Sequence, residues 1–167
     1  MMPPRALSQD LRLHAGPDMR RRRWLVGPSL FGMAIGQVIT LYRTGIIRHL
    51  PDPPLDLFDS ERVNASDYAY KRLQIPDAML MIGTYAATAA LAAAGGRDRA
   101  ERMPLLPVAL AAKTLFDVGT NLKLAQEEWA DNRAFRAYCQ TASLVPVVSA
   151  VLALPEAARG LAKLFGR

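Results

Sequence analysis

The chain has 167 residues, of which 51% are apolar and 22% are charged, and its formal net charge at pH 7 is +6. This length suits a single domain. The positive charges are gathered in a few segments and are not interleaved with aromatic residues, so no nucleic-acid partner is predicted.

Long apolar runs dominate the sequence, and a bilayer-spanning helix needs roughly 17–25 such residues. The expected spans are residues 24–41, 78–94, 105–124 and 134–154. The first two runs carry no charge, whereas the third contains Lys113, Asp117 and Lys123, and the fourth has Arg136 near its start. The alternative is a soluble bundle of very apolar helices, which four such runs in one short chain disfavour. We therefore expect an all-α polytopic membrane protein with a four-helix transmembrane bundle.

Basic residues predict how this bundle is oriented. Arginines occupy residues 20–23 before the first span, further arginines occur within 97–102, and the last ten residues are basic again. The link between the third and fourth spans, residues 127–133, is acidic. Because cytoplasmic segments are enriched in Lys and Arg, both termini are expected in the cytoplasm and the loop 43–76 outside. Abundant alanine and arginine indicate a bacterium, and hence its inner membrane.

These boundaries divide the chain into a cytoplasmic basic tail (1–23), a transmembrane domain (24–157) and a second cytoplasmic tail (158–167). Residues 1–19 are polar and contain three prolines, which favours disorder. The outer loop is expected to be ordered and to lie across the bundle, with a short helix at 67–74 capped by Asn64 or Ser66. Asp77 is placed where it can cap the second span.

Lys113 and Asp117 are four residues apart, which places both on one helix face. Either charge alone would cost roughly 2.5–3.5 kcal/mol near the bilayer centre, so a pair facing the bundle is expected. Such a pair is either purely structural, with Lys113 also able to reach toward an interface, or part of a proton path or polar ligand pocket.

The remaining candidates for chemistry are few. His14 and His49 are isolated in sequence, so no metal site is predicted. Asn64-Ala65-Ser66 matches a glycosylation acceptor, but a helix cap is the preferred interpretation. Cys139 is the only cysteine in the chain, and Arg136 lies three residues before it.

Three segments resemble bacterial members of the vitamin K epoxide reductase family. They are RHLPDPPLDLFDSERVNASDYAYKRLQIPDA, GGRDRAER and the AYC sequence before the last apolar helix, and the resemblance covers residues 24–157. It implies a transmembrane bundle of four helices with both ends in the cytoplasm. It also implies electron transfer from thiols to a quinone, through a Cys-x-x-Cys pair at the outer end of the last helix and relay cysteines in the outer loop.

Measured against that resemblance, the redox motif is incomplete. The pair would fall on residues 136–139, where Cys139 is present but Arg136 stands in place of the first cysteine. Thiol–disulfide exchange needs an attacking and a resolving sulfur, and one sulfur alone can form only a mixed disulfide. Arg136 and Cys139 are therefore interpreted as a vestigial motif on one helix face, with a catalytic Cys139 as the alternative.

The sequence thus favours a non-enzymatic accessory or structural subunit of a larger membrane complex, such as a respiratory or photosynthetic one. Its expected partners are other membrane subunits and membrane lipid, and no cofactor is required. Two alternatives stay open. One is a quinone- or lipid-binding membrane protein, with quinone as its ligand. The other is a thiol–quinone oxidoreductase that uses the thiols of a partner.

Overall fold

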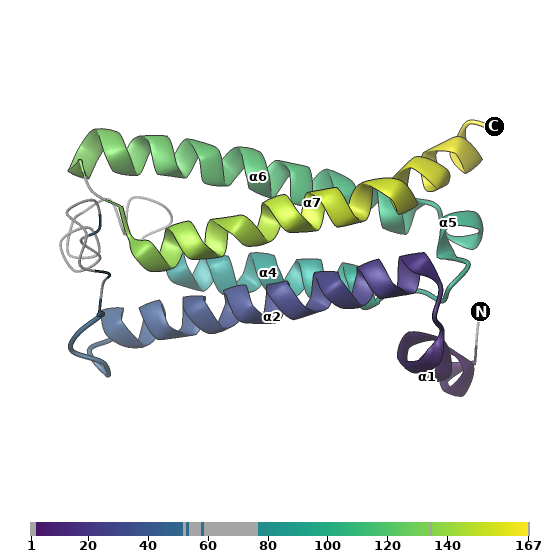
Figure 1. The fold of residues 1–167 in the computed structure, drawn as a ribbon, viewed down its shortest axis with the longest axis horizontal. Helices are drawn as coiled ribbons and strands as arrows, with labels where there is room; N and C mark the ends of the chain where they lie inside the picture. Colours follow the sequence, from purple (N-terminus) through teal and green to yellow (C-terminus); the bar gives the residue numbers. More distant parts are fainter. Residues whose placement is uncertain (1–2, 52, 54–57, 59–76, 134, 167) are drawn as a thin grey trace.

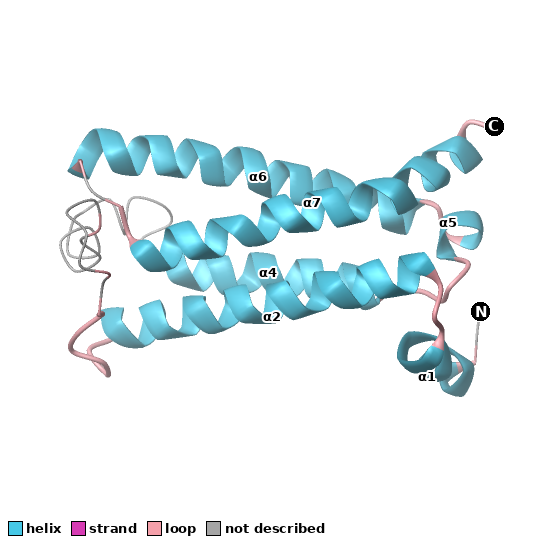
Figure 2. Cartoon of the chain, viewed as in Figure 1, coloured by secondary structure: helices cyan, strands magenta, loops and turns pink. Residues whose placement is uncertain are grey.

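The computed structural model describes residues 3–51, 53, 58, 77–133 and 135–166, and every regular element within them is a helix (Figure 2). The helices are α1 (Pro4–Leu13), α2 (Pro17–Arg43), α4 (Asp77–Ala93), α5 (Arg99–Arg102), α6 (Leu105–Asn132) and α7 (Ala137–Leu164). Outside these helices, Phe58 and Phe135 form an isolated bridge. The prediction of an all-α chain is confirmed for the described residues.

The long helices α2, α4, α6 and α7 lie side by side along the longest axis of the molecule, and both termini lie at one end (Figure 1). Helix α2 packs mainly against α4 and α7, while α6 packs mainly against α7. Close approach depends on small residues: a Cβ atom on Gly32 would lie 2.6 Å from the Tyr85 ring, and one on Gly160 would lie 2.9 Å from the carbonyl oxygen of Pro104.

Two apolar clusters form the core. The cluster nearer the termini is built on Leu25, Ala92, Leu110, Ala153 and Ala157. The cluster at the other end contains Ile35, Ile39, Ala78, Tyr85, Ala142 and Val145. Because many of these core residues are alanines, the backbones approach closely, which is typical of helix packing within membranes.

The outer surface of the long helices carries many large apolar side chains. Phe116 is 73% exposed, Val151 64% and Leu144 63%. Buried charged groups, described below, occupy the interior instead. By length and apolar composition, α2 and α7 are able to cross a membrane, and α4 is an apolar helix of 17 residues. Exposed apolar faces around a partly polar interior suit a lipid environment better than water.

The prediction of a disordered tail is wrong for the described residues 3–19. Residues Pro4–Leu13 form α1, and α2 already begins at Pro17, so the arginines at 20–23 belong to the first turns of a long helix. Of the prolines that suggested disorder, Pro4 and Pro17 stand at the first helical position of α1 and α2, where the fixed φ of proline favours helix initiation. Leu7 and Leu11, one turn apart, then give α1 a half-buried apolar side.

Two other boundaries also differ from expectation. The acidic link 127–133 is largely helical, because α6 continues to Asn132 and ends where Arg133 adopts a left-handed conformation with φ of 51°. Residues 158–164, expected as a tail, are the last turns of α7, where good helix formers such as Ala, Leu and Lys follow one another. Most of the loop 43–76, including Asn64, Ser66 and the short helix expected at 67–74, lies outside the described residues.

Candidate functional site

A pocket of about 550 Å³ opens between α4, α6 and α7, at the end of the bundle away from the termini. Its apolar walls include Met81, Leu124 and Phe116. Polar groups reach it from all three helices: Thr84, Asp117, Thr120, Asn121, Gln140 and Ser143. An apolar cavity with a few convergent polar groups is the usual form of a small-molecule site.

Lys113 and Asp117 lie on the α6 side of this region and contact each other. The Lys113 Nζ atom lies 2.5 Å from Asp117 Oδ2 and also donates to the Thr84 carbonyl oxygen and the Thr88 hydroxyl, both at 2.5 Å. Thr84 Oγ1 donates to the other carboxylate oxygen of Asp117 at 3.2 Å. Asp117 also lines the pocket, so an ion pair with satisfied hydrogen bonds forms part of its wall.

Arg136 immediately precedes α7, in an extended conformation, rather than lying on the face of that helix as the sequence suggested. Arg136 is buried, with 3% of its surface exposed. Its guanidinium donates to Asp77 at 3.0 Å and to Glu128 at 3.3 Å, while its backbone N–H donates to Glu128 Oε1 at 2.6 Å. Arg43, the last residue of α2, contacts Asp77 at 2.6 Å.

These four charged groups connect the end of α2, the start of α4, the last turns of α6 and the start of α7. Asp77, expected to cap the second span, is the first residue of α4, and its carboxylate is shared between Arg43 and Arg136. Glu128 lies beyond residue 124, the end of the expected third span. Burial raises the pKa of its carboxyl, and the Arg136 guanidinium opposes that shift. We call Arg43, Asp77, Glu128 and Arg136 the distal charge cluster, because it lies at the end of the bundle away from the termini.

Cys139 is half-buried in the first turn of α7 and packs against the second apolar cluster. It lines the pocket together with Arg136, so the vestigial motif and the cavity coincide. The thiol therefore lies beside the space a ligand would occupy, yet the chain supplies no second sulfur with which it could form a disulfide.

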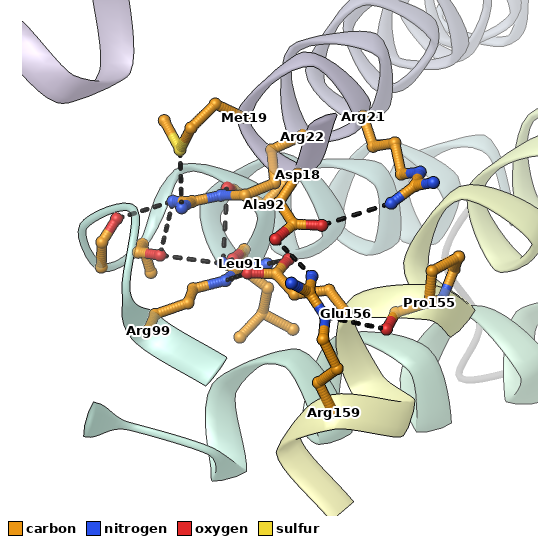
Figure 3. Close-up of polar contacts among 12 residues, drawn as sticks. Asp18, Met19, Arg21, Arg22, Leu91, Ala92, Arg99, Pro155, Glu156 and Arg159 are labelled. Carbon is orange, nitrogen blue, oxygen red and sulfur yellow. Dashed lines mark hydrogen bonds and ion pairs between the residues drawn. The ribbon is translucent and has the colours of Figure 1, made fainter. Parts of the chain in front are cut away.

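At the opposite end, two buried arginines surround the C-terminal end of α4 (Figure 3). Arg22 donates to the carbonyl oxygens of Ala92, Ala94, Gly95 and Gly96 at 2.7–3.0 Å. Each of these contacts satisfies a carbonyl at or just beyond the helix end, where intrahelical partners are missing.

Arg99 completes this arrangement from the short helix α5. It donates to the carbonyl oxygens of Leu91 and Ala94 and forms a two-point ion pair with Glu156 of α7, at 2.8 and 2.7 Å. Arg159 contacts Asp18 across the same end. The three basic segments noted in the sequence are thus brought together at one end of the molecule.

The two histidines do not approach each other. His14 follows the last residue of α1, and His49 belongs to the segment after α2. Across the described parts of the chain, no group of three His, Cys, Asp or Glu side chains is arranged to hold a metal ion.

Sequence reasoning missed several of the residues that shape these sites. Glu128 had been treated as part of the acidic link 127–133, and Glu156 had been given no role. Both are buried partners of arginines. The only available signal was an acidic residue next to an apolar run. Arg99 and Glu156 are 57 positions apart, so nothing local in the sequence pairs them.

The fold and site define a helical membrane protein with a ligand-sized pocket beside a single thiol. The family model described as the vitamin K epoxide reductase family matches residues 23–154, and the chain therefore belongs to that family. The resemblance inferred from sequence is confirmed. Members of this family are integral membrane proteins that couple thiol oxidation to quinones. No curated protein and no solved structure matches the chain.

Proposed function

We propose that the chain is a four-span protein of a bacterial inner membrane that binds a quinone-class ligand in the pocket beside Cys139. Both termini would lie in the cytoplasm, as the three basic segments at one end support. The observation that carries the proposal is the pocket itself, because a cavity of about 550 Å³ accommodates a ring with the beginning of an apolar tail.

The lining of the pocket suits this class of ligand. Quinone oxygens accept hydrogen bonds, and the side-chain amides of Asn121 and Gln140 are donors on facing helices. Apolar residues such as Met81 and Leu124 offer contact to the ring and tail. The Lys113–Asp117 pair gives the wall a fixed dipole without leaving an uncompensated charge.

The proposal includes no autonomous thiol chemistry. Reduction of a quinone takes two electrons, and a thiol supplies them by forming a disulfide with a second sulfur. Arg136 stands where the other cysteine of the pair would be, and it forms ion pairs with Asp77 and Glu128. Cys139 could complete the reaction only with a thiol from a partner protein.

A second candidate is an accessory subunit of a larger membrane complex. The apolar side chains exposed along α6 and α7, among them Phe116 and Val151, favour it. Such surfaces fit the helices of another membrane subunit as well as lipid. The two functions are compatible, because a subunit can hold a quinone for a neighbouring enzyme.

Quinone binding can be tested with glycine variants that differ only in location. Gly83 lines the pocket and has open space around its missing Cβ, whereas Gly119 has equally open space but lies outside the pocket. We expect a short-chain quinone to raise the melting temperature of the purified protein, Gly83→Leu to abolish this shift, and Gly119→Leu to preserve it. Equal shifts in both variants, or no shift in the unmodified protein, would argue against quinone binding.

We expect the protein alone not to catalyse quinone reduction by a dithiol, and a rate assay tests this. Purified protein supplied with a dithiol and a quinone should give the same rate as Cys139→Ala. A rate above background that disappears in Cys139→Ala would show that the thiol is catalytic.

A further inference from the structure

A second cavity, of about 390 Å³, lies at the end of the bundle that holds both termini. Its floor is formed by small and apolar residues of α2 and α4, among them Val26, Gly27 and Ala93. Leu11 of α1 closes one side, and Arg22 and Arg23 supply the cationic part of its lining. We call this cavity the inner groove.

The two arginines of the inner groove differ in whether their guanidinium groups have hydrogen-bond donors available to a ligand. The guanidinium of Arg22 is buried and engaged with the end of α4. Arg23 is exposed, and it donates through Nε to the Leu11 carbonyl oxygen at 2.9 Å and through one terminal nitrogen to that of His14 at 2.8 Å. Within the described part of the chain, its other terminal nitrogen has no partner.

Among the described residues, no carboxylate forms an ion pair with Arg23. Asp18, the acidic residue in the first turn of the same helix, contacts Arg21 and Arg159 instead. Arg5 and Arg12, seven positions apart on α1, are exposed at this end as well. The mouth of the inner groove therefore favours an anion, and a guanidinium held in a fixed position is well suited to a phosphate group.

The floor of the groove favours a ligand that carries an apolar chain as well as an anionic group. A Cβ atom on Gly27 would meet no heavy atom within 4 Å, so the groove is open at this residue. On the same helix Trp24 is 65% exposed and Leu30 55%, which marks the surrounding surface as one that lipid tails cover. An aromatic residue next to arginines is typical of the boundary between headgroups and acyl chains.

We propose that the inner groove binds one anionic phospholipid. The phosphate would lie against Arg23, and an acyl chain would run over Gly27 and Ala93. Arg23 fastens the end of α1 at the same time, so a bound lipid would also hold α1 against the bundle. The site is separate from the pocket beside Cys139 and shares no lining residue with it.

The test measures lipid retention by native mass spectrometry after the full-length protein, purified in mild detergent, is mixed with phosphatidylglycerol or phosphatidylcholine. We expect one phosphatidylglycerol to be retained in preference to phosphatidylcholine. Gly27→Leu should reduce this retention about tenfold, equivalent to about 1.4 kcal/mol, because its side chain fills the groove. Arg23→Gln should remove the preference for the anionic lipid.

Matched controls separate this site from general lipid contact. Gly119→Leu adds the same side chain at another open position, and Lys123→Gln removes one exposed charge from α6. Both should retain phosphatidylglycerol as the unmodified protein does. Equal retention of the two lipids, or equal losses in Gly27→Leu and Gly119→Leu, would overturn the proposal. Displacement of the lipid by millimolar inorganic phosphate would identify a free-anion site instead.

Discussion

The Lys113–Asp117 pair offers the sharpest test of how charge is accommodated inside this bundle. The two side chains are 19% and 9% exposed, and Lys113 has further hydrogen bonds to Thr84 and Thr88. Removing one member of a buried pair costs about 3–5 kcal/mol. Partial exposure of Lys113 places the expected loss near the lower limit, about 3 kcal/mol, for either Lys113→Met or Asp117→Leu.

The double variant should be less harmful than the sum of the single variants, because neither charge is then left without its partner. We expect a coupling free energy of about 2 kcal/mol, within the range found for residues in direct contact. The measurement is a double-mutant cycle in which the free energy of unfolding is determined by denaturing-detergent titration in mixed micelles.

The same helix carries its own control. Lys123 and Glu127 have the same four-residue spacing, but their charged atoms are 3.9 Å apart and their side chains are 75% and 29% exposed. A cycle on this pair should give a coupling of only about 0.3–0.5 kcal/mol. The reasoning would be refuted if both cycles gave the same coupling, or if the Lys113/Asp117 double variant were no more stable than the worse single variant.

Two other predictions follow from the opposite ends of the bundle. Arg22→Gln should lower the free energy of unfolding by about 3 kcal/mol, because it leaves buried carbonyls at the end of α4 without donors. As a control, Arg21→Gln changes a half-exposed neighbour and should lower the free energy of unfolding by less than about 1 kcal/mol. Similar losses in the two variants would contradict this role for Arg22. For the proposed topology, a cysteine introduced at residue 60 in a Cys139→Ala background should react with an impermeant thiol reagent in intact cells, and labelling only after lysis would place that loop inside.

The sequence was sufficient for the helices whose apolar runs are long and uncharged, and for the family. It was insufficient wherever helix formation depended on contacts distant in sequence. The start of α2 is a clear example: a run of arginines suggested a solvated tail, yet Arg22 is buried because the end of α4, 70 positions away, supplies its acceptors. Hydropathy assigns the same free energy of burial to Arg21 and Arg22, and only the fold shows that Arg22 is the buried one.

The candidate site was also only partly predictable. Spacing placed Lys113 and Asp117 on one helix face, but their hydrogen bonds to α4 could not be read from α6 alone. The sequence placed Arg136 on the face of the last span, whereas in the fold it precedes α7 and joins three helices through carboxylates. The pocket is a property of three packed helices, and no local pattern marks it.

The distal charge cluster has a consequence for how this protein is made. A chain whose helix ends were joined by a disulfide would depend on an oxidising compartment to form that bond. Here Arg136 joins the same region to Asp77 and Glu128 as soon as the helices meet. Folding of this chain should therefore need no oxidase and should proceed equally well in a host that lacks the machinery for disulfide formation. Reducing agents would leave this end of the bundle intact, whereas loss of a single carboxylate would loosen it.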